Sequence, residues 1–332
     1  MSSPPTTACE SPVPEPLAEA RPRATPYQSS AEFWLNFLFF CACRAPWFVR
    51  LSKPFWMFLS RHFFQGPLRG GIDRNARWLL GPKADAAARR ALADRVLENF
   101  YLFVYDVGRA GLMNRAQILA QIGRTAGEEH FHRALARGRG VILATVHLGS
   151  FEVGVAAASS QGPPVHVVFQ EDVMDAFNRI RHRLHRTLGV VEAPVEDGWQ
   201  AWMKLRDALA RNELVLMQAD RVMPGHRGVA VPFCGGHIEL PLGPVKLAAL
   251  SGAPIVPVFA PRQADGTVDL IIEPAIDVGG DEVGPGSCAV PPALLALART
   301  IQKQVLAHPD QWLMLHSVWL EDRAGPPVNP DA

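Results

Sequence analysis

The sequence lacks any continuous apolar run long enough to cross a bilayer, and it contains few cysteines. A membrane-spanning helix needs about 20 consecutive, mostly apolar residues, and Arg44 ends the first apolar stretch well before that length. The five cysteines, at 9, 41, 43, 234 and 288, are odd in number and show no zinc-binding spacing. This pattern is typical of reduced thiols in a cytosolic compartment. We also find no charged start, apolar core and cleavage site that would mark a signal peptide.

The sequence also lacks a charge excess, internal repeats and several catalytic or metal-binding patterns. Its 33 basic and 32 acidic side chains give a net charge of +1, without the basic footprint of a nucleic-acid binder. The absence of a G-x-S-x-G elbow argues against a serine hydrolase. His130 with His132, and His237 with Glu239, resemble metal pairs only superficially and are expected in surface loops. We therefore expect no metal, no cofactor and no nucleic-acid partner.

The chain divides into four expected parts. Residues 1–29 are rich in proline and small polar residues and have almost no large aliphatic side chains, so we expect a disordered tail. Residues 30–68 form an aromatic segment, and residues 69–322 are long enough to form one α/β domain with a large core. Residues 323–332 form a second tail.

The aromatic segment predicts contact with a membrane surface. Twelve of the chain's 25 Phe and Trp residues lie in residues 32–65, interleaved with basic side chains. Helices that lie in a bilayer interface combine aromatic residues at headgroup depth with cations directed toward anionic lipid. A buried aromatic helical hairpin is the alternative interpretation.

Beyond Gly140, short apolar runs alternate with helical patterns. The expected strands are residues 141–146, 165–169, 214–218, 254–260 and 268–272, and the expected helices are residues 151–160, 174–188, 199–211, 242–251 and 293–306. An alanine-rich helix is expected before them, at residues 83–112. This alternation predicts an α/β fold with a mixed, mostly parallel sheet flanked by helices, preceded by the aromatic helical segment.

The stretch "ILATVHLGSFEVG" places a histidine where a buried strand ends. On one continuous helix a spacing of five would turn His147 and Glu152 apart by roughly 140°. The two side chains can therefore meet only if His147 lies off the helix, and Gly149 gives the freedom for such a turn. Glu152 would then hold the imidazole as a general base. A core histidine beside an ordinary first-turn glutamate is the alternative that this spacing leaves open.

Five blocks together resemble the bacterial lipid A biosynthesis (late) acyltransferase family of the lysophospholipid acyltransferase superfamily. They are "HLGSFE", "DAFNRIRHRLHRTLG", "LVLMQADRVMPGHRGVAVPFCGG", "LPLGPVKLAALSGAPIVPVF" and "HPDQWLMLHSVWL", in the order and spacing of that family. The resemblance covers residues 30–320. It implies transfer of an acyl chain from an acyl-carrier-protein or CoA thioester to a hydroxyl of a glycolipid such as a lipid A precursor, at the cytoplasmic face of the inner membrane.

The resemblance also implies roles for individual residues. His147 matches the base of the family and Glu152 its acidic partner, while Asp220 matches the aspartate of an Ala-Asp-Gln motif. The arginine of the family falls on Arg181 or Arg183. Positive charge from either arginine, or backbone N–H groups near Gly149, would stabilise the oxyanion that forms on the thioester carbonyl.

The chain departs from the common pattern at three positions. Phe151 replaces a tryptophan, Arg221 replaces a glutamine, and Gln170 lies where an arginine is common. The motifs "HLGSFE", "ADR" and "PLGP" resemble more closely a divergent subgroup associated with other lipids, including aryl polyene-type products. Another polar lipid or a polyene-type product is therefore an alternative acceptor. A lipid-binding protein with a decayed site is the non-enzyme alternative.

The "DAFNRIRHRLHRTLG" block predicts a basic helix near the site. Arg179, Arg183 and Arg186 share one helical face. With Arg221 and Arg181, this surface could hold an acceptor phosphate or the acidic carrier protein. A solvated basic face is the alternative.

Overall fold

The computed structural model describes residues 26–63, 67–171, 175–195, 198–223, 226–279 and 290–322. The expected C-terminal tail and residues 1–25 of the expected N-terminal tail lie outside these ranges. Helix α1 begins at Pro26, so residues 26–29, expected in the tail, belong to a helix.

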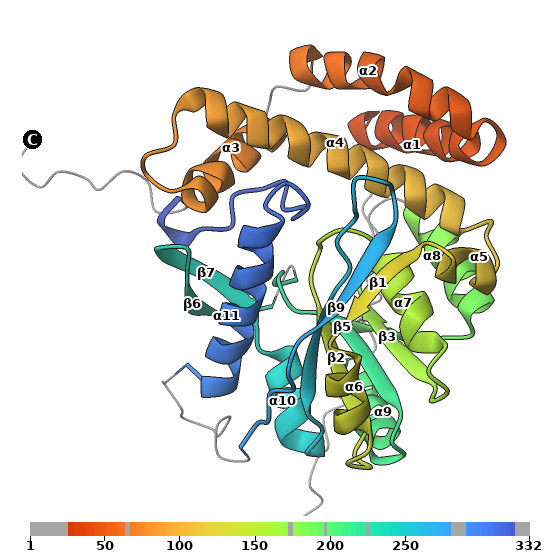
Figure 1. Cartoon of the computed structure of the whole chain (residues 1–332), viewed down its shortest axis with the longest axis vertical. Helices are drawn as coiled ribbons and strands as arrows, with labels where there is room; N and C mark the ends of the chain where they lie inside the picture. The colour runs from red at the N-terminus through yellow and green to blue at the C-terminus, as the bar shows by residue number, and fades with distance from the viewer. Residues whose placement is uncertain are drawn as a thin grey trace, which may run out of the picture.

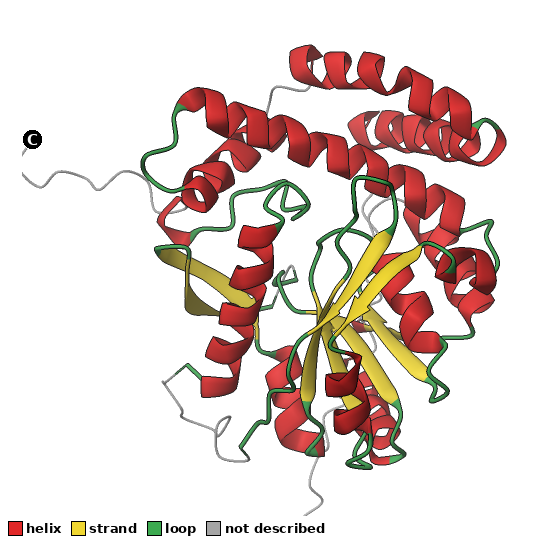
Figure 2. Cartoon of the chain, viewed as in Figure 1, coloured by secondary structure: helices red, strands yellow, loops and turns green. Residues whose placement is uncertain are grey.

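A seven-stranded sheet forms the centre of the molecule (Figures 1 and 2). Its strands are β1 (Ile122–Ala126), β2 (Val141–Thr145), β3 (Val165–Phe169), β4 (Val191–Pro194), β5 (Leu214–Gln218), β8 (Ile255–Phe259) and β9 (Val268–Ile272). The spatial order is β1-β9-β8-β2-β5-β3-β4. Strands β8, β2, β5, β3 and β4 are parallel, whereas β9 is antiparallel to β8 and β1 is parallel to β9. The predicted mixed, mostly parallel sheet is therefore confirmed.

Helices cover both faces of this sheet, which explains the continuously apolar sequences of its central strands. One face is covered by α9 (Gly198–Ala210), α10 (Gly243–Ser251) and α11 (Pro292–Ala307), the other by α5 (Arg115–Leu119), α6 (Glu128–Leu135), α7 (Phe151–Ser159) and α8 (Asp175–Leu188). Every residue of β2 is buried. A separate hairpin of β6 (Gly228–Phe233) and β7 (Gly236–Pro241) packs near α11.

The strands and helices expected beyond Gly140 agree with the structure to within about one or two residues at each end. Sequence patterning missed β1, β4, the β6–β7 hairpin, α5 and α6. These elements are short or amphipathic: β1 is "IGRTA", with three exposed residues, and β4 lies at the sheet edge. The apolar periodicity that identifies buried strands is therefore absent from them.

A layer of four helices lies across the carboxyl edge of the parallel strands (Figure 1). It consists of α1 (Pro26–Arg44), α2 (Pro46–Phe63), α3 (Pro67–Leu80) and α4 (Ala86–Ala110). Asp85 begins α4 as its N-cap, accepting a hydrogen bond from the Ala88 N–H. Tyr101 of α4 donates a hydrogen bond to the carbonyl of Val49 in α2, 2.9 Å away. Within the described ranges, no helix combines the length and apolarity that a bilayer crossing requires.

Candidate active site

The ends of two adjacent parallel strands bring His147 and Asp220 together. Strands β2 and β5 pair in register up to Thr145 and Gln218, so each functional side chain lies two residues beyond its strand. His147 Nδ1 is 2.9 Å from Asp220 Oδ1, and the His147 backbone N–H donates to Asp220 Oδ2 at 2.9 Å. The carboxyl edge of a parallel sheet is the usual place for ligand sites in such folds.

Asp220 is an ionised, fully buried hydrogen-bond acceptor. Burial alone would raise its pKa, but the charge of His147 and the hydrogen bonds from His147 and Trp312 outweigh burial and hold the pKa below its ordinary value. An ionised carboxylate can only accept hydrogen bonds. The proton of the neutral imidazole therefore lies on Nδ1, which leaves Nε2 of His147 free to act as a base.

The turn after His147 needs a glycine, as the sequence indicated. Gly149 has φ of 70°, and a Cβ at this position would lie 2.0 Å from the carbonyl oxygen of Ala260. The backbone N–H groups of this turn are already paired, because Gly149 donates to Gln311 at 3.2 Å and Ser150 donates to Ala260 at 2.9 Å. The expectation that N–H groups near Gly149 stabilise an oxyanion is therefore wrong for these two donors.

The structure also corrects the expected contact between Glu152 and the imidazole. After the turn at Gly149, which lies beside the end of β8, the chain enters α7, and Glu152 lies in the first turn of this helix. The hydrogen-bond partner of His147 Nδ1 is Asp220 rather than Glu152. Glu152 is buried, and its Oε2 has no hydrogen-bond partner among the described residues. Burial raises the pKa of Glu152 to about 7, with a further rise from Asp106 and an opposing effect from Arg181 and Arg262.

Of the two candidate arginines, Arg181 is the one that lies near the site. Its charge acts on Glu152, and its Nη1 donates to the carbonyl of Gln170 at 3.1 Å. The guanidinium also lies over the ring of Phe169, 5.3 Å from its centroid. Arg183 is exposed on the outer face of α8. The geometry therefore favours Arg181 as the site arginine.

The other expected binding residues lie further from this centre. Arg179 is exposed and donates to Asn36 of α1 at 2.9 Å, so it joins α8 to the helical layer. Arg221 is exposed directly after Asp220. His132 and His237 pair with Glu128 and Glu321 respectively, and the described part of the chain holds no cluster of three or more potential metal ligands.

Sequence reasoning missed four residues that complete the site: Asp106, Arg262, Gln311 and Trp312. Asp106 of α4 forms an ion pair with Arg262, which follows β8. Gln311 Oε1 accepts from the Arg262 backbone N–H at 2.7 Å. Trp312 and Gln311 belong to the quoted "HPDQW" block, which was a usable signal, whereas nothing in the pattern of α4 distinguished Asp106.

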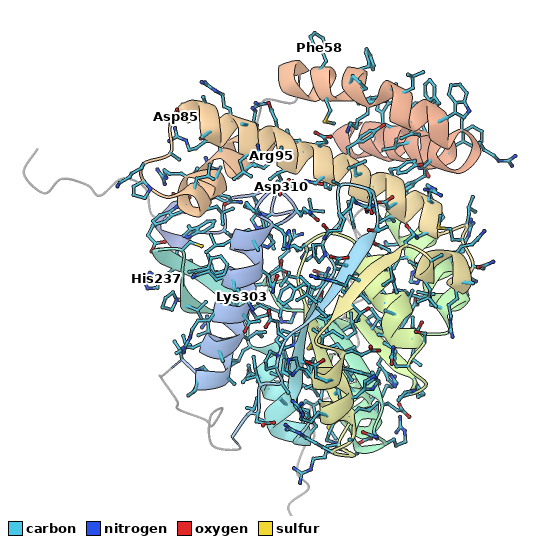
Figure 3. All side chains as sticks on the ribbon, in the orientation of Figure 1. Phe58, Asp85, Arg95, His237, Lys303 and Asp310 are labelled. Atoms are coloured by element: carbon cyan, nitrogen blue, oxygen red, sulfur yellow. The ribbon has the colours of Figure 1, made fainter. Side chains whose placement is uncertain are left out.

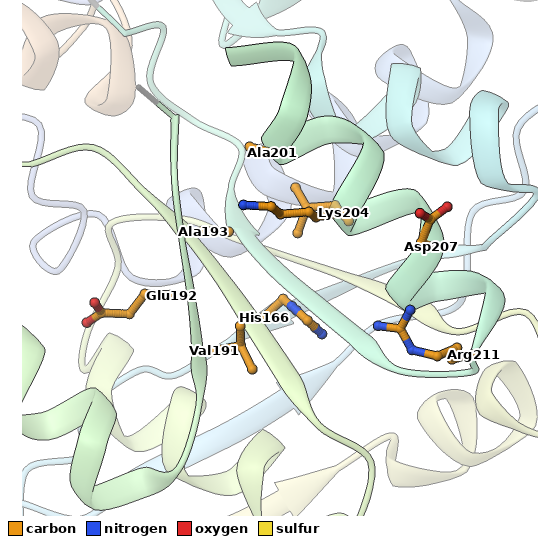
Figure 4. Close-up of a pocket in the computed structure, with 9 residues that line it drawn as sticks. His166, Val191, Glu192, Ala193, Ala201, Lys204, Asp207 and Arg211 are labelled. Carbon is orange, nitrogen blue, oxygen red and sulfur yellow. The ribbon is translucent and has the colours of Figure 1, made fainter. Parts of the chain in front are cut away.

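An apolar cavity of about 120 Å³ adjoins the site. Thr145, Phe151 and Ala260 line it beside the turn that follows His147, and Gly154 and Ala157 of α7 continue its wall. A second cavity, of about 270 Å³, is lined by His166, Val191 and Arg211 among others (Figure 4). His166 and Val191 lie at the amino ends of β3 and β4, and Arg211 lies in the turn before β5, so these lining residues are at the opposite edge of the sheet from His147.

The fold and site place a histidine, hydrogen-bonded to a buried aspartate, at the carboxyl edge of an α/β sheet. The sequence model of the bacterial lipid A biosynthesis acyltransferases matches residues 51–321. The chain belongs to this family and is an acyltransferase.

Curated relatives with similar sequences include acyltransferases for two glycolipids. A phosphatidylinositol mannoside acyltransferase of Mycobacterium tuberculosis is 29% identical over 269 residues, which cover 80% of each chain. Its counterpart in Mycolicibacterium smegmatis is 28% identical over 58% of this chain and 61% of the relative. The lipid A biosynthesis lauroyltransferase of Escherichia coli is 23% identical over 74% and 76%.

Proposed function

We propose that this protein transfers a fatty acyl chain from a thioester donor to a hydroxyl of a membrane glycolipid. The observation that carries the proposal is the position of the His147 and Asp220 pair, at the sheet edge beneath the helical layer. The relatives that act on phosphatidylinositol mannosides and lipid A precursors support a glycolipid acceptor. The lipid A type is the first candidate, and another polar lipid is the alternative.

His147 would activate the acceptor. Nε2 takes the proton of the hydroxyl as its oxygen attacks the thioester carbonyl, and ionised Asp220 stabilises the resulting imidazolium. The acyl–oxygen bond forms, the acyl–sulfur bond breaks, and the proton on Nε2 passes to the departing thiolate. No metal or cofactor is needed for this sequence of steps.

Glu152 and Arg181 would stabilise the developing charge. With a pKa of about 7, a substantial fraction of Glu152 is protonated at neutral pH. Its unpaired Oε2 then carries the proton and donates a hydrogen bond to a bound substrate. Arg181 supplies positive charge at the same edge. Donors that are fixed before the reaction and shielded from water stabilise an oxyanion strongly.

The cavity beside Thr145 offers a place for the acyl chain. It is lined largely by apolar side chains and begins at residues that flank the catalytic turn. At Gly154 an added Cβ would meet no heavy atom within 4 Å, so this glycine leaves open space in the wall. An acyl chain bound there would have its carbonyl carbon near the turn that carries His147.

The membrane surface would lie against α1 and α2. Trp34, Trp47 and Phe55 are each more than half exposed, and Phe58 projects from α2 on the side away from α4 (Figure 3). Soluble monomers rarely expose a continuous apolar patch of this kind, which marks an interaction surface. Because the same helical layer covers the sheet edge, a lipid acceptor at the cytoplasmic face of the inner membrane would be near His147.

The donor would approach from the side of α8. Arg183 and Arg186 are exposed on this helix, and α8 packs on both α7 and α4. A carrier protein with acidic surface helices would be attracted to these charges. Acyl-carrier-protein thioesters are therefore the proposed donors, with acyl-CoA as the alternative.

An acyl-transfer assay with purified His147→Ala tests the proposal. We expect a loss of the order of 10² to 10⁴ in rate, with an unchanged circular dichroism spectrum. A folded variant with near-normal turnover would exclude His147 as the base. Lack of transfer by the wild-type protein to any lipid extract would instead favour a lipid-binding protein. A lipidomic comparison of cells with and without the protein would identify the acceptor.

A further inference from the structure

The C-terminal segment Gln311–Leu313 crosses the site and contacts the catalytic turn on both sides. The Gln311 carbonyl accepts the Gly149 N–H at 3.2 Å, and the Leu313 N–H donates to the carbonyl of His147 at 2.8 Å. Asp310, immediately before this segment, is anchored to α4 by Asn99, whose side chain donates to the Asp310 carbonyl at 2.9 Å. Asp310 and α4 lie together in Figure 3.

Trp312 extends this contact to the carboxylate of the catalytic pair. Its indole Nε1 donates to Asp220 Oδ2 at 3.0 Å, which is the same oxygen that accepts the His147 backbone N–H. The other oxygen is left to accept from the imidazole Nδ1. The two donors on Oδ2 therefore fix the plane of the carboxylate and direct Oδ1 at the ring.

The indole itself is held tightly. Trp312 is 2% exposed, and its ring contacts Phe233 at 5.7 Å and Trp319 at 6.1 Å between centroids. Trp319 in turn stacks on Trp78 and donates its own Nε1 to the carbonyl of Phe233 at 3.1 Å. The packing leaves Trp312 little freedom to change rotamer, so its N–H is directed at Asp220 before substrate binds.

We propose that Trp312 is a positioning residue for acyl transfer, which acts through Asp220 to orient and tune the His147 base. The inference rests on the proposed role of His147. It gives a function to the "HPDQW" block, which neither the base nor the lipid-contacting helices explain.

The direction of the effect follows from the hydrogen bond. The indole N–H withdraws charge from the carboxylate, so removing it concentrates negative charge that faces the imidazole. The protonated imidazole is then favoured, and the active neutral form requires a higher pH. Glu152, Asp106, Arg181 and Arg262, which are charged groups at this edge, and the exposed Arg221 remain unchanged by the substitution.

The test compares Trp312→Phe with Trp319→Phe. Both substitutions remove one buried indole N–H from the same aromatic cluster, but only the first removes a donor to Asp220. For Trp312→Phe we expect kcat/KM at pH 7 to fall about 3- to 10-fold, and the acidic limb of its pH profile to move upward by roughly 0.5 unit, as the loss of one hydrogen bond implies. For Trp319→Phe we expect lower thermal stability with the wild-type profile.

A second readout does not depend on turnover. Diethylpyrocarbonate reacts with neutral imidazole, so the pH dependence of His147 modification, followed by peptide mass spectrometry, should move upward in the same way. If Trp312→Phe does not fold, benzothienylalanine at position 312 keeps the shape of the indole and removes only the N–H. Wild-type pH dependence in the folded variant would overturn the inference, as would equal shifts in both variants. A fully active His147→Ala would instead overturn the proposed base.

Discussion

Two buried carboxyl groups at the site have pKa values shifted in opposite directions, because Asp220 accepts hydrogen bonds on both oxygens whereas one oxygen of Glu152 accepts none among the described residues. Asp220 accepts three hydrogen bonds, from the backbone and ring of His147 and from Trp312, and its pKa is lowered. Glu152 is also buried, but its Oε2 has no partner among the described residues, and its pKa is raised to about 7. This separation of the two pKa values suits the proposed roles, in which ionised Asp220 supports the base and neutral Glu152 donates a hydrogen bond.

At the scale of the residue, Glu152→Gln should change stability with a definite pH dependence. The folded protein holds the Glu152 proton up to a pKa of about 7, whereas the ordinary value is 4.5. The contribution of Glu152 to the free energy of unfolding therefore falls as pH rises from about 4.5 to about 7. Glutamine does not titrate, so the variant should gain stability relative to the wild type by about 3 kcal/mol above pH 7. The gain should disappear near pH 4.5.

Thermal melts at pH 5 and pH 8, followed by circular dichroism, measure this difference. Acyl transfer by Glu152→Gln should be slower, because an amide N–H is a weaker hydrogen-bond donor to the developing oxyanion than a protonated carboxyl group. If the two proteins show the same change in Tm between pH 5 and pH 8, Glu152 does not carry the raised pKa.

At the scale of the element, α7 both carries Glu152 and lines the cavity beside the site. Its sequence "FEVGVAAAS" places Glu152 on the first turn and small residues along the cavity wall. Glycine in a helix interior costs about 0.5–1 kcal/mol relative to alanine. The open space beside Gly154 leaves room in the cavity that we propose binds the acyl chain.

Gly154→Leu should therefore shorten the acyl chains that the enzyme accepts. The leucine side chain would fill the cavity beside the catalytic turn, so kcat/KM should fall more than 10-fold for long-chain donors and change little for short ones. Gly154→Ala is the matched control, with near-normal chain-length preference and slightly higher stability. An equal loss for all chain lengths would place the acyl chain elsewhere.

Helix α8 offers a second prediction, on the donor. Reversing both exposed charges, in the double variant Arg183→Glu with Arg186→Glu, should raise KM for acyl-carrier-protein thioesters by roughly 10-fold or more. This rise in KM should be larger at low salt, because the charges are then less screened. Transfer from a small uncharged thioester such as an acyl-N-acetylcysteamine should be unaffected. Arg133→Glu, at an exposed position of α6, is the control for a general charge effect. Equal losses with both donors would contradict carrier-protein docking on α8.

At the scale of the whole molecule, the helical layer places the aromatic surface and the site on one side of the sheet. Phe39 and Ala42 of α1 are buried against α4, while Trp34 and Phe37 of the same helix are exposed. One helix face thus holds the layer to the domain, and the exposed face is the one that we propose contacts the bilayer interface. This arrangement explains why so many aromatic residues occur in a segment that does not supply the main core.

Replacing Trp34, Phe37, Trp47 and Phe55 with serine should move the protein from the membrane fraction to the soluble fraction. Each substitution removes apolar area available to the interface and leaves the buried residues of α1 and α2 in place. Flotation with vesicles that contain anionic lipid measures the change. Replacement of Leu112 and Leu306, exposed leucines outside α1 and α2, is the control. Unchanged flotation of the quadruple variant would contradict the interfacial role.

The sequence by itself determined the α/β class, the buried strands and the position of His147 at a strand end. These features follow from local patterns: continuous apolar runs for strands covered on both faces, helical periodicity between them, and a glycine where the chain turns sharply. The family resemblance, carried by five motif blocks, was confirmed by the match over residues 51–321.

Only the tertiary structure decided which groups meet. Asp220, 73 positions after His147, becomes its partner because β2 and β5 are adjacent in the sheet, although β3 and β4 intervene in sequence. Glu152, only five positions away, lies in the first turn of α7 instead, where Asp106 of α4 acts on its pKa. Trp312 reaches Asp220 from the end of the chain. Such contacts depend on strand order and on the path of loops, and neither is encoded in the periodicity of a single segment.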